Sequence, residues 1–452
     1  MSLVYSSLNH PLRVPLAAEV HSRPFLRLAA PESLTHLAVY ASQGLSSAVD
    51  DDISGTQHAI LLALCGHFGV AGPGTEAKYF FHDFGRFRLK WECHTEFATY
   101  TFAQSQPAGL AIGAAFDQVP LQHIPQLWLQ SLRGKLMVAA HVALEQGDSF
   151  LASSLPTMGQ LFENNMQAGS HVLQGGEIRT DFVIQADGFS RFLMRDVGLQ
   201  EQQAGRLVQR MLEIETYRMM ALLGLPHAQR AAPILNAIEG ELAKLTAAMT
   251  DNQHSTANTT PDEDGEQALL NDIIGLAARI EKLSLENSYR FSASQAYFRL
   301  VKARIDELRE LRVEGIPTIG EFMERRLAPA MDTCASIARR QEALAERIAH
   351  TNDLLRTRVG IVQEQQNRKI LESLNKRAAQ QLLLQQAVEG LSVVAISYYL
   401  AGLVNYVGKA AKAAGWPVNP DMATGIMIPV IVAGVWWGLS RMHLRLKEHS
   451  GR

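Results

Sequence analysis

The residues near the start of the chain that could do chemistry are histidines and carboxylates. The segment HPLRVPLAAEVHSRPF contains His10, Glu19 and His21, and an aspartate triplet follows at residues 50–52. Zinc accepts imidazole and carboxylate ligands, whereas carboxylates alone suit harder cations such as magnesium. We interpret His10, Glu19 and His21 as a candidate metal site. Because their spacing follows no metal-site rule, surface, capping or hydrogen-bonding roles are the alternative, as is a solvated acidic loop for the triplet.

Motifs that mark catalytic or nucleotide-binding sites are missing from the sequence. It has no GxxxxGK[ST] or GxGxxG loop, no HExxH or GxSxG motif, and no SxxK motif with catalytic companions. Lys and Arg total 42 against 45 Asp and Glu, and the resulting net charge of −3 offers no general attraction for nucleic acid. We therefore expect neither an enzyme nor a nucleic-acid binder.

The cysteines and the N-terminal segment indicate the compartment. Cys65, Cys93 and Cys334 occur without CxxC spacing, which favours a reducing environment over a disulfide framework. The opening residues, MSLVYSSLNHPLRVP, lack a basic stretch followed by a long apolar one, so we expect no secretory signal peptide. The bulk of the chain is expected in the cytoplasm.

Two long uncharged runs lie near the C-terminus. Residues 390–408, GLSVVAISYYLAGLVNYVG, and residues 422–440, MATGIMIPVIVAGVWWGLS, contain no Asp, Glu, Lys or Arg. A helix of about 20 residues crosses a hydrocarbon core of about 30 Å. Because both runs are apolar on every face, with aromatic residues clustered in and around them, we predict transmembrane helices at 387–408 and 422–440. A buried helical hairpin in a soluble core is the alternative.

Basic residues flank the two predicted spans on their outer sides. The residues that precede the first span or follow the second are Arg368, Lys369, Lys376, Arg377, Arg441, Arg445, Lys447 and Arg452. The connecting loop, 409–421, holds only Lys409 and Lys412. The excess of Lys and Arg on cytoplasmic segments places both termini, including the basic tail 441–452, in the cytoplasm, and makes 409–421 a short external loop.

Polar side chains within the first predicted span could line a path for ions. Tyr398, Gly402 and Asn405 lie four and seven residues apart, which places them on one face of a helix. Polar groups in a membrane helix tend to face a bundle interior or a water-filled path. Together with Glu389 at the cytoplasmic end, they are the candidate pore-lining residues. Hydrogen bonding between helices without transport is the alternative.

The rest of the chain divides into two regions of different character. Residues 1–225 contain strand-like runs such as AKYFFHDF, RFRLKWEC and EIRTDFVIQ and a few helical stretches, which predict a cytoplasmic α+β domain with a mainly antiparallel sheet. Residues 226–386 predict a helical region that contains a long helix from Glu266 to Val313 and a flexible polar loop at 250–266. A second long helix starts near residue 330 and runs into the first span as a stalk on the order of 120 Å long.

Several segments together resemble the bacterial domain-of-unknown-function family 3422. They are HPLRVPLAAEVHSRPF, GEIRTDF, TIGEFMERRLAPAMDTC and LESLNKRAAQQLLLQQAVEGLSVVAISYYLAGLVNYVGKA, and the resemblance spans essentially the whole chain. That family has no assigned activity. The resemblance implies a bacterial protein, and with the two spans it predicts the inner membrane.

The predicted architecture also resembles the CorA superfamily of divalent-cation channels. Its members assemble as pentamers, their first span lines the pore, and a Gly-Met-Asn triplet lies at the outer end of that span. Here the corresponding stretch from Gly402 to Tyr406 reads GLVNY, so Asn405 is the one residue that can match the triplet. The resemblance implies a homo-oligomeric channel or transporter in the lipid bilayer, with magnesium or zinc as the cation. The alternative is a non-conducting, membrane-anchored sensor or interaction protein.

Overall fold

The fold is that of a computed structural model, which describes residues 8–449 apart from 15, 18–23, 41–52, 108–113, 149–160, 163–166, 201, 256–262, 416 and 418. The chain divides into two compact units. Unit 1 comprises Met1–Ala257 and Leu269–Asn352, and unit 2 comprises Asn258–Ala268 and Asp353–Arg452. The predicted α+β class is confirmed, with the sheet in the N-terminal half and the longest helices in the C-terminal half.

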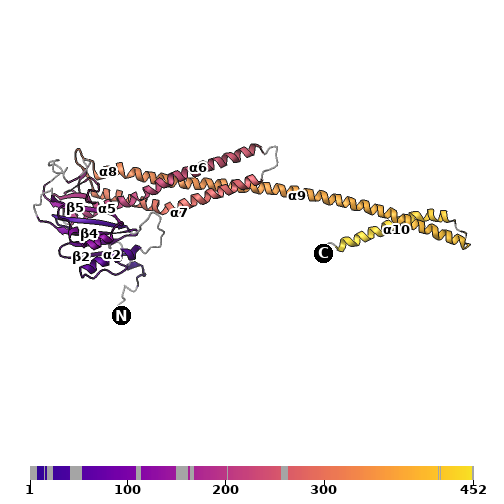
Figure 1. The fold of residues 1–452 in the computed structure, drawn as a ribbon, viewed down its shortest axis with the longest axis horizontal. Helices are drawn as coiled ribbons and strands as arrows, with labels where there is room; N and C mark the ends of the chain where they lie inside the picture. The colour runs from indigo at the N-terminus through magenta and orange to yellow at the C-terminus, as the bar shows by residue number, and fades with distance from the viewer. Residues whose placement is uncertain are drawn as a thin grey trace. The chain divides into compact units, whose positions relative to one another are not determined.

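Unit 1 is built on one sheet (Figure 1). In the described residues its strands lie in the order β2-β3-β4-β1-β5-β8-β7-β6-β9. The strands are β1 Glu32–Tyr40, β2 Tyr79–Asp83, β3 Arg88–Cys93, β4 Phe97–Ser105, β5 Leu136–Gln146, β6 Ala168–Val172, β7 Gly176–Thr180, β8 Ser190–Asp196 and β9 Leu311–Arg312. Neighbouring strands are antiparallel except β5 and β8, which are parallel. The prediction of a mainly antiparallel sheet is confirmed.

One face of this sheet carries an apolar core beneath the helices α2 (Ile53–His67) and α3 (Gln126–Ser131), which follows η3 (Pro120–His123). Side chains alternate between the two faces of a strand, so Trp91 of β3 and Tyr100 of β4 both reach this core and are fully buried. The indole N–H of Trp128 on α3 donates to the carbonyl of Ile60 on α2 at 2.8 Å. That bond ties the two covering helices together.

The opposite face of the sheet packs against α5 (Gln203–Leu222). Side chains that alternate with the core residues point this way, among them His36 of β1, Lys90 of β3 and Thr99 of β4. These positions are polar, whereas the neighbours of Lys90 and Thr99 in their strands, Leu89, Trp91, Ala98 and Tyr100, are apolar or aromatic. The two faces of the sheet therefore have different chemistry, and the polar one lies beneath α5.

Three long helices continue unit 1: α6 (Gly224–Ser255), α7 (Glu263–Leu308) and, after the short α8 (Ile319–Arg326), the first part of α9 (Ala328–Ala413). Side-chain pairs hold them together, including Arg279 with Glu241 at 2.5 Å and Arg340 with Glu239 at 2.9 Å. A capping box between Thr318 and Glu321 fixes the start of α8. These helices confirm the predicted helical region.

Two predicted boundaries in this region are wrong. The polar segment expected as a loop over 250–266 is helical at both ends, since α6 runs to Ser255 and α7 begins at Glu263; residues 256–262 lie outside the described part. The long helix predicted to end at Val313 ends at Leu308, and Leu311–Arg312 form the edge strand β9 against β6. Local polarity alone did not mark these ends, because helices extend through polar residues while their hydrogen bonds continue.

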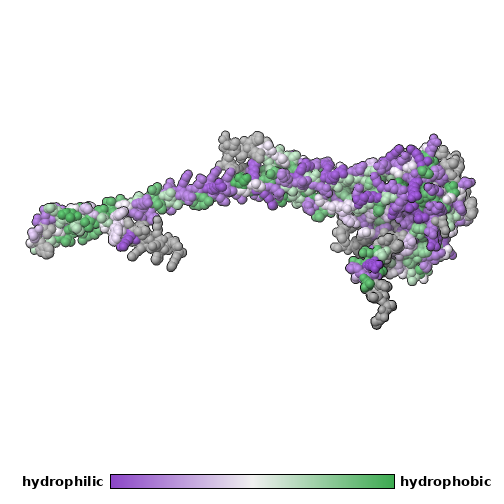
Figure 2. Space-filling view, turned by 180° about the vertical axis from the view of Figure 1, so that it is seen from behind, coloured by the Kyte–Doolittle hydropathy of each residue, from purple (hydrophilic) through white to green (hydrophobic). Residues whose placement is uncertain are grey.

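Unit 2 contains the remainder of α9 and the helix α10 (Pro420–His449), and the ion pair of Arg358 with the mostly buried Glu266 at 2.6 Å. Both α9 and α10 contain an 18-residue window long and apolar enough to cross a membrane, and only 6% and 0% of these windows is buried. Figure 2 shows hydrophobic surface gathered at the end of these helices where α9 and α10 connect, and mostly hydrophilic surface along the middle of α9. A helical hairpin in a soluble core would be mostly buried, so this exposure argues against that alternative. The helices extend beyond the predicted spans, and the segment expected as a basic tail is helical to His449.

Candidate functional site

A cavity of about 190 Å³ lies in unit 1 between the sheet and α5. Strands β1, β3 and β4 supply its floor, α5 its roof, and Arg304 of α7 and the segment around Leu26 its sides. A space of this size holds several water molecules or a small organic molecule. Its lining includes apolar side chains and two separate ion pairs.

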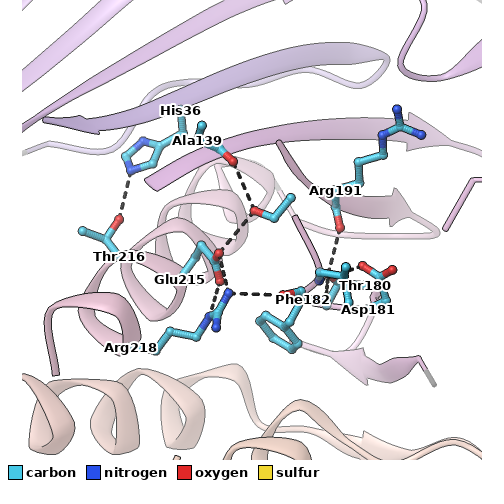
Figure 3. A network of polar contacts seen from close by, with 11 residues as sticks. His36, Ala139, Thr180, Asp181, Phe182, Arg191, Glu215, Thr216 and Arg218 are labelled. Atoms are coloured by element: carbon cyan, nitrogen blue, oxygen red, sulfur yellow. Dashed lines mark hydrogen bonds and ion pairs between the residues drawn. The ribbon is translucent and has the colours of Figure 1, made fainter. Parts of the chain in front are cut away.

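His36 joins the floor of this cavity to its roof (Figure 3). Its Nδ1 lies 2.8 Å from the hydroxyl of Thr101 on β4, and its Nε2 lies 3.0 Å from the hydroxyl of Thr216 on α5. Burial, aided by the charge of Lys90, lowers the pKa of His36 to about 3. The imidazole is therefore neutral near pH 7, with one nitrogen donating and the other accepting, and it positions α5 on the sheet.

Lys90 and Glu92 form the first ion pair of the cavity. They lie two residues apart on β3 and so share a face of the strand, with Nζ 3.1 Å from a carboxylate oxygen. The Lys90 ammonium also donates to the side-chain carbonyl of Gln209 on α5 at 3.1 Å. Lys90 is almost fully buried. An ammonium group has three N–H donors, and these two contacts engage two of them.

The second ion pair joins α5 to α7. Arg304 donates from Nε to the carboxylate of Glu213, and from Nη1 to Glu307 at 2.7 Å. Gln209 donates to the other oxygen of Glu213 at 2.8 Å. The cavity is thus lined by two cationic and two anionic side chains, so the formal charges of these four groups sum to zero.

Thr99 supplies an unused polar atom to this cavity. It lies on β4 directly opposite Glu92 on β3, and its side chain is more than nine-tenths buried. Within the described part of the chain its hydroxyl has no hydrogen-bond partner. A buried hydroxyl without a partner costs about 1–3 kcal/mol. An occupant of the cavity that hydrogen-bonds to Thr99 recovers this free energy.

A second polar network lies beside the cavity and fixes the position of α5 (Figure 3). The buried carboxylate of Glu215 accepts from Ser190 of β8 at 3.2 Å and from Arg218 at 2.5 and 2.7 Å. Arg218 also donates to the carbonyl of Phe182 at 3.4 Å, and Phe182 adopts the left-handed backbone region with φ of 55°. The Glu215 carboxylate and the Arg218 guanidinium thus bind each other and their protein neighbours, so this network holds α5 in place.

The metal site suggested by the sequence receives no support from the part of the chain that the structure describes. His10 is exposed, and its Nδ1 accepts from the backbone N–H of Leu12 at 3.2 Å. Glu19, His21 and the aspartates at 50–52 lie outside the described residues. Among the described residues no group of three His, Cys, Asp or Glu side chains is arranged to hold a metal ion.

The four candidate pore-lining residues lie on α9 in unit 2. Tyr398 is 76% exposed, and Gly402 has open space at the position of a side chain. Asn405 is half-buried, and its side-chain oxygen has no hydrogen-bond partner among the described residues. Glu389 is half-buried and lies about 160° around the helix from Asn405 by the α-helical period. Asn405 and Tyr398 thus share a helix face that Glu389 does not.

Sequence reasoning did not identify the cavity residues. The alternation of Lys90 and Glu92 with Leu89, Trp91 and Cys93 was present in the strand-like run RFRLKWEC, and it indicates one polar face. A polar strand face is usually solvent-exposed, and only the placement of α5 over it makes it a cavity wall.

The chain was compared with protein families, curated proteins and solved structures. A family model described as "Protein of unknown function (DUF3422)" matches residues 8–446. None of the curated proteins compared with the chain matches it. A solved structure described as "structure of the full-length CmaX protein" is 12% identical, with 68% of this chain and 89% of that chain covered and a TM-score of 0.15. That TM-score is too low for the likeness to carry an argument.

Proposed function

The chain belongs to the DUF3422 family, as its sequence motifs predict, and from this premise we propose that it is a membrane-anchored sensor whose unit 1 binds a small polar molecule. The observation that carries the proposal is the cavity beneath α5. Its lining includes a buried Thr99 hydroxyl that has no partner among the described residues, and a buried Lys90 ammonium that contacts Gln209 and Glu92. Ligand pockets combine apolar walls with a few such polar groups.

The anchor of this proposal is unit 2. Its apolar helices expose their side chains, which is favourable in hydrocarbon and costly in water. The flanking Lys and Arg residues support a hairpin with both termini in the cytoplasm of a bacterial cell and the α9–α10 connection outside the inner membrane. Unit 1 then meets cytoplasmic small molecules. The proposal includes no catalytic step and no nucleic-acid partner.

Arg304 gives the bound molecule a way to act on the rest of the protein. It belongs to α7, it borders the cavity, and it holds Glu213 of α5. A molecule that enters the cavity changes the surroundings of this pair, so α5 and α7 both respond to binding. Such a response is what separates a sensor from a simple binding protein.

Retention of small molecules tests this function. Full-length protein in detergent is incubated with the small-molecule fraction of a bacterial extract, passed through a desalting column, and denatured, and the released molecules are identified by mass spectrometry. The control is Val208→Phe, which fills the cavity from the buried Val208 on α5. We expect a molecule retained by the wild type and lost from the variant, with equal melting temperatures. Identical profiles would refute ligand binding in this cavity.

A second candidate function is the passage of a divalent cation through a homo-oligomer. Ser397 and Asn405 of α9 each carry a shielded side-chain oxygen without a partner in the described chain, and the surrounding helix is apolar. In hydrocarbon such oxygens need a partner, and a second copy or a partly hydrated cation supplies one. Outside the predicted span, Ile370, Leu374 and Leu382 are each more than half exposed, which favours packing against copies of the same helix.

Particle mass and ion flux test this second candidate. Light scattering of the detergent-extracted protein is expected to give about five chains per particle, as the CorA resemblance implies. In proteoliposomes, Asn405→Ala is expected to reduce the flux of magnesium, cobalt or zinc. A monomeric particle leaves no shared path, and unchanged flux would remove Asn405 from the pore.

A further inference from the structure

We infer that the cavity of unit 1 takes a small zwitterion of the α-amino-acid class, with a carboxylate and an ammonium group close together and an apolar side chain. This inference rests on the proposed function and specifies its ligand. The juxtaposition behind it is two ion pairs, Lys90 with Glu92 and Arg304 with Glu213, beside one unpaired hydroxyl, Thr99.

The balance of charges in the wall excludes ligands with a single charge. An anion that approaches Lys90 also approaches Glu92, whose carboxylate lies 3.1 Å from the Lys90 ammonium. A cation that approaches Glu213 likewise meets Arg304. A single charge therefore gains from one group of the wall and is repelled by the group next to it. A zwitterion presents one charge to each member of a pair.

The spare hydrogen-bonding capacity matches a carboxylate in particular. The Lys90 ammonium is a charged group with three N–H donors, and the Thr99 hydroxyl can donate as well. Lys90 and Thr99 belong to the adjacent strands β3 and β4 and line the same cavity. Thr99 lies directly opposite Glu92 and diagonally across from Lys90, so both donors are on the same face of neighbouring strands, where one carboxylate can use both. The Glu92 carboxylate next to them accepts from the ligand's ammonium group.

The apolar part of the cavity wall favours a ligand with an apolar side chain. Leu34, Phe97 and Leu212 line the cavity and are apolar and buried or nearly so, and Leu26 closes the side formed by the N-terminal segment. A polyol could use the polar groups but would place hydroxyls against these side chains without hydrogen bonds, which is unfavourable. An amino acid with an apolar side chain can hydrogen-bond to the polar groups and place its side chain against the apolar ones. The volume of about 190 Å³ limits it to a molecule of this size.

Direct binding tests this inference. Full-length protein in detergent is heated with each standard L-amino acid at about 10 mM, where even a weak ligand shifts the melting temperature. The best amino acid is then titrated by calorimetry beside its two truncated analogues. For leucine these are 4-methylpentanoate, which lacks the ammonium group, and 3-methylbutylamine, which lacks the carboxylate. We expect each analogue to bind at least tenfold more weakly.

Two threonine variants separate the cavity from the rest of the surface. Thr99→Val removes the unpaired hydroxyl and is expected to weaken the binding of the amino acid about tenfold. The matched control is Thr333→Val, an exposed position on α9 whose hydroxyl bonds to the carbonyl of Pro329, and it should leave affinity unchanged.

The inference is overturned if no amino acid shifts the melting temperature, if the analogues bind equally well, or if Thr99→Val has no effect on affinity. These outcomes would refute the amino-acid ligand without refuting the proposed sensor function. If the extract experiment recovers a molecule of another class that Val208→Phe excludes, the sensor function stands and the ligand class is wrong. If it recovers nothing and no amino acid shifts the melting temperature, both proposals fail.

Discussion

The carboxylate of Glu96, just before β4, is held by the guanidinium of Arg290 on α7, 194 residues further along the chain. The side chains of both residues are less than a tenth exposed. Tyr297 donates its hydroxyl to the same carboxylate at 2.9 Å, and the hydroxyl of Tyr40 accepts from Arg290 at 3.0 Å. This cluster fastens α7, which carries Arg304, to the ends of the interior strands β1 and β4.

Removal of one partner of this pair should destabilise unit 1. Arg290→Met leaves the Glu96 carboxylate buried without its counter-charge, and we expect a loss of about 3–5 kcal/mol of unfolding free energy. The double variant Glu96→Gln, Arg290→Met should recover much of that loss, since no buried charge remains. The unfolding free energies of the single and double variants are measured by urea unfolding. Hydrogen exchange in β4 and α7 then shows whether the loss of stability is located at this contact. If the single and double variants are equally stable, the buried charge is not the source of the effect.

Gly205 at the start of α5 should not accept a side chain. A Cβ at this position would lie 1.9 Å from the carbonyl oxygen of Leu26, which is backbone and cannot rotate away. Gly205→Ala is therefore expected to displace the segment around Leu26, open the cavity, and cost about 1–3 kcal/mol. Faster hydrogen exchange in residues 24–29 reports the displacement.

Gly240→Ala is the matched control for that substitution. Gly240 lies within α6 and has no atom within 4 Å of its would-be Cβ. Alanine has the higher helix propensity, so this variant should gain up to about 1 kcal/mol. Equal effects of the two substitutions would mean that the contact with Leu26 does not constrain the segment.

The neutral state of His36 makes the stability of unit 1 depend on pH. In the unfolded chain its pKa is 6.5, whereas in the folded protein burial lowers the pKa to about 3. Between these values the unfolded state binds a proton that the folded state does not, so stability is complete above pH 6.5 and falls as the pH drops toward 3. The contribution reaches at most about 1.4 kcal/mol per pH unit.

His36→Gln isolates this contribution. The amide can still reach Thr101 and Thr216 but does not titrate, so the variant should lose stability less steeply than the wild type between pH 6.5 and 3. Burial also lowers the pKa of His141, on the other face of the sheet, to about 4. His141 is present in both proteins, so the difference between their stability curves isolates the contribution of His36. Parallel stability curves would show that His36 is not the titrating group.

Charges placed within the apolar helices should prevent membrane insertion. Arg at the centre of a membrane helix costs about 2.5–3.5 kcal/mol, and we expect Leu400→Arg combined with Val432→Arg to shift the protein from the carbonate-resistant membrane pellet to the soluble or aggregated fraction. The control pair, Leu127→Arg with Leu285→Arg, changes highly exposed leucines of unit 1 and should stay in the pellet. Equal extraction of both pairs would argue against the anchor.

The sequence by itself determined the local elements and the family. The strand-like runs AKYFFHDF and RFRLKWEC became β2 and β3, the helical pattern after residue 330 became α9, and the uncharged runs became the exposed apolar helices of unit 2. These features depend on the order of polar and apolar residues within one segment, which the sequence displays directly. The end of α7 at Leu308 involves a distant segment, because the backbone N–H of Leu173 donates to the Leu308 carbonyl at 3.1 Å, and the sequence did not predict this end.

Only the tertiary structure decided the candidate site. Lys90 and Glu92 lie on a polar strand face that is indistinguishable by sequence from a solvated one, and α5, more than a hundred residues later, converts it into a closed wall. The parallel pairing of β5 with β8 and the Glu96–Arg290 contact likewise join distant segments. Which distant segments meet depends on the packing of the whole unit, and no local pattern encodes that packing.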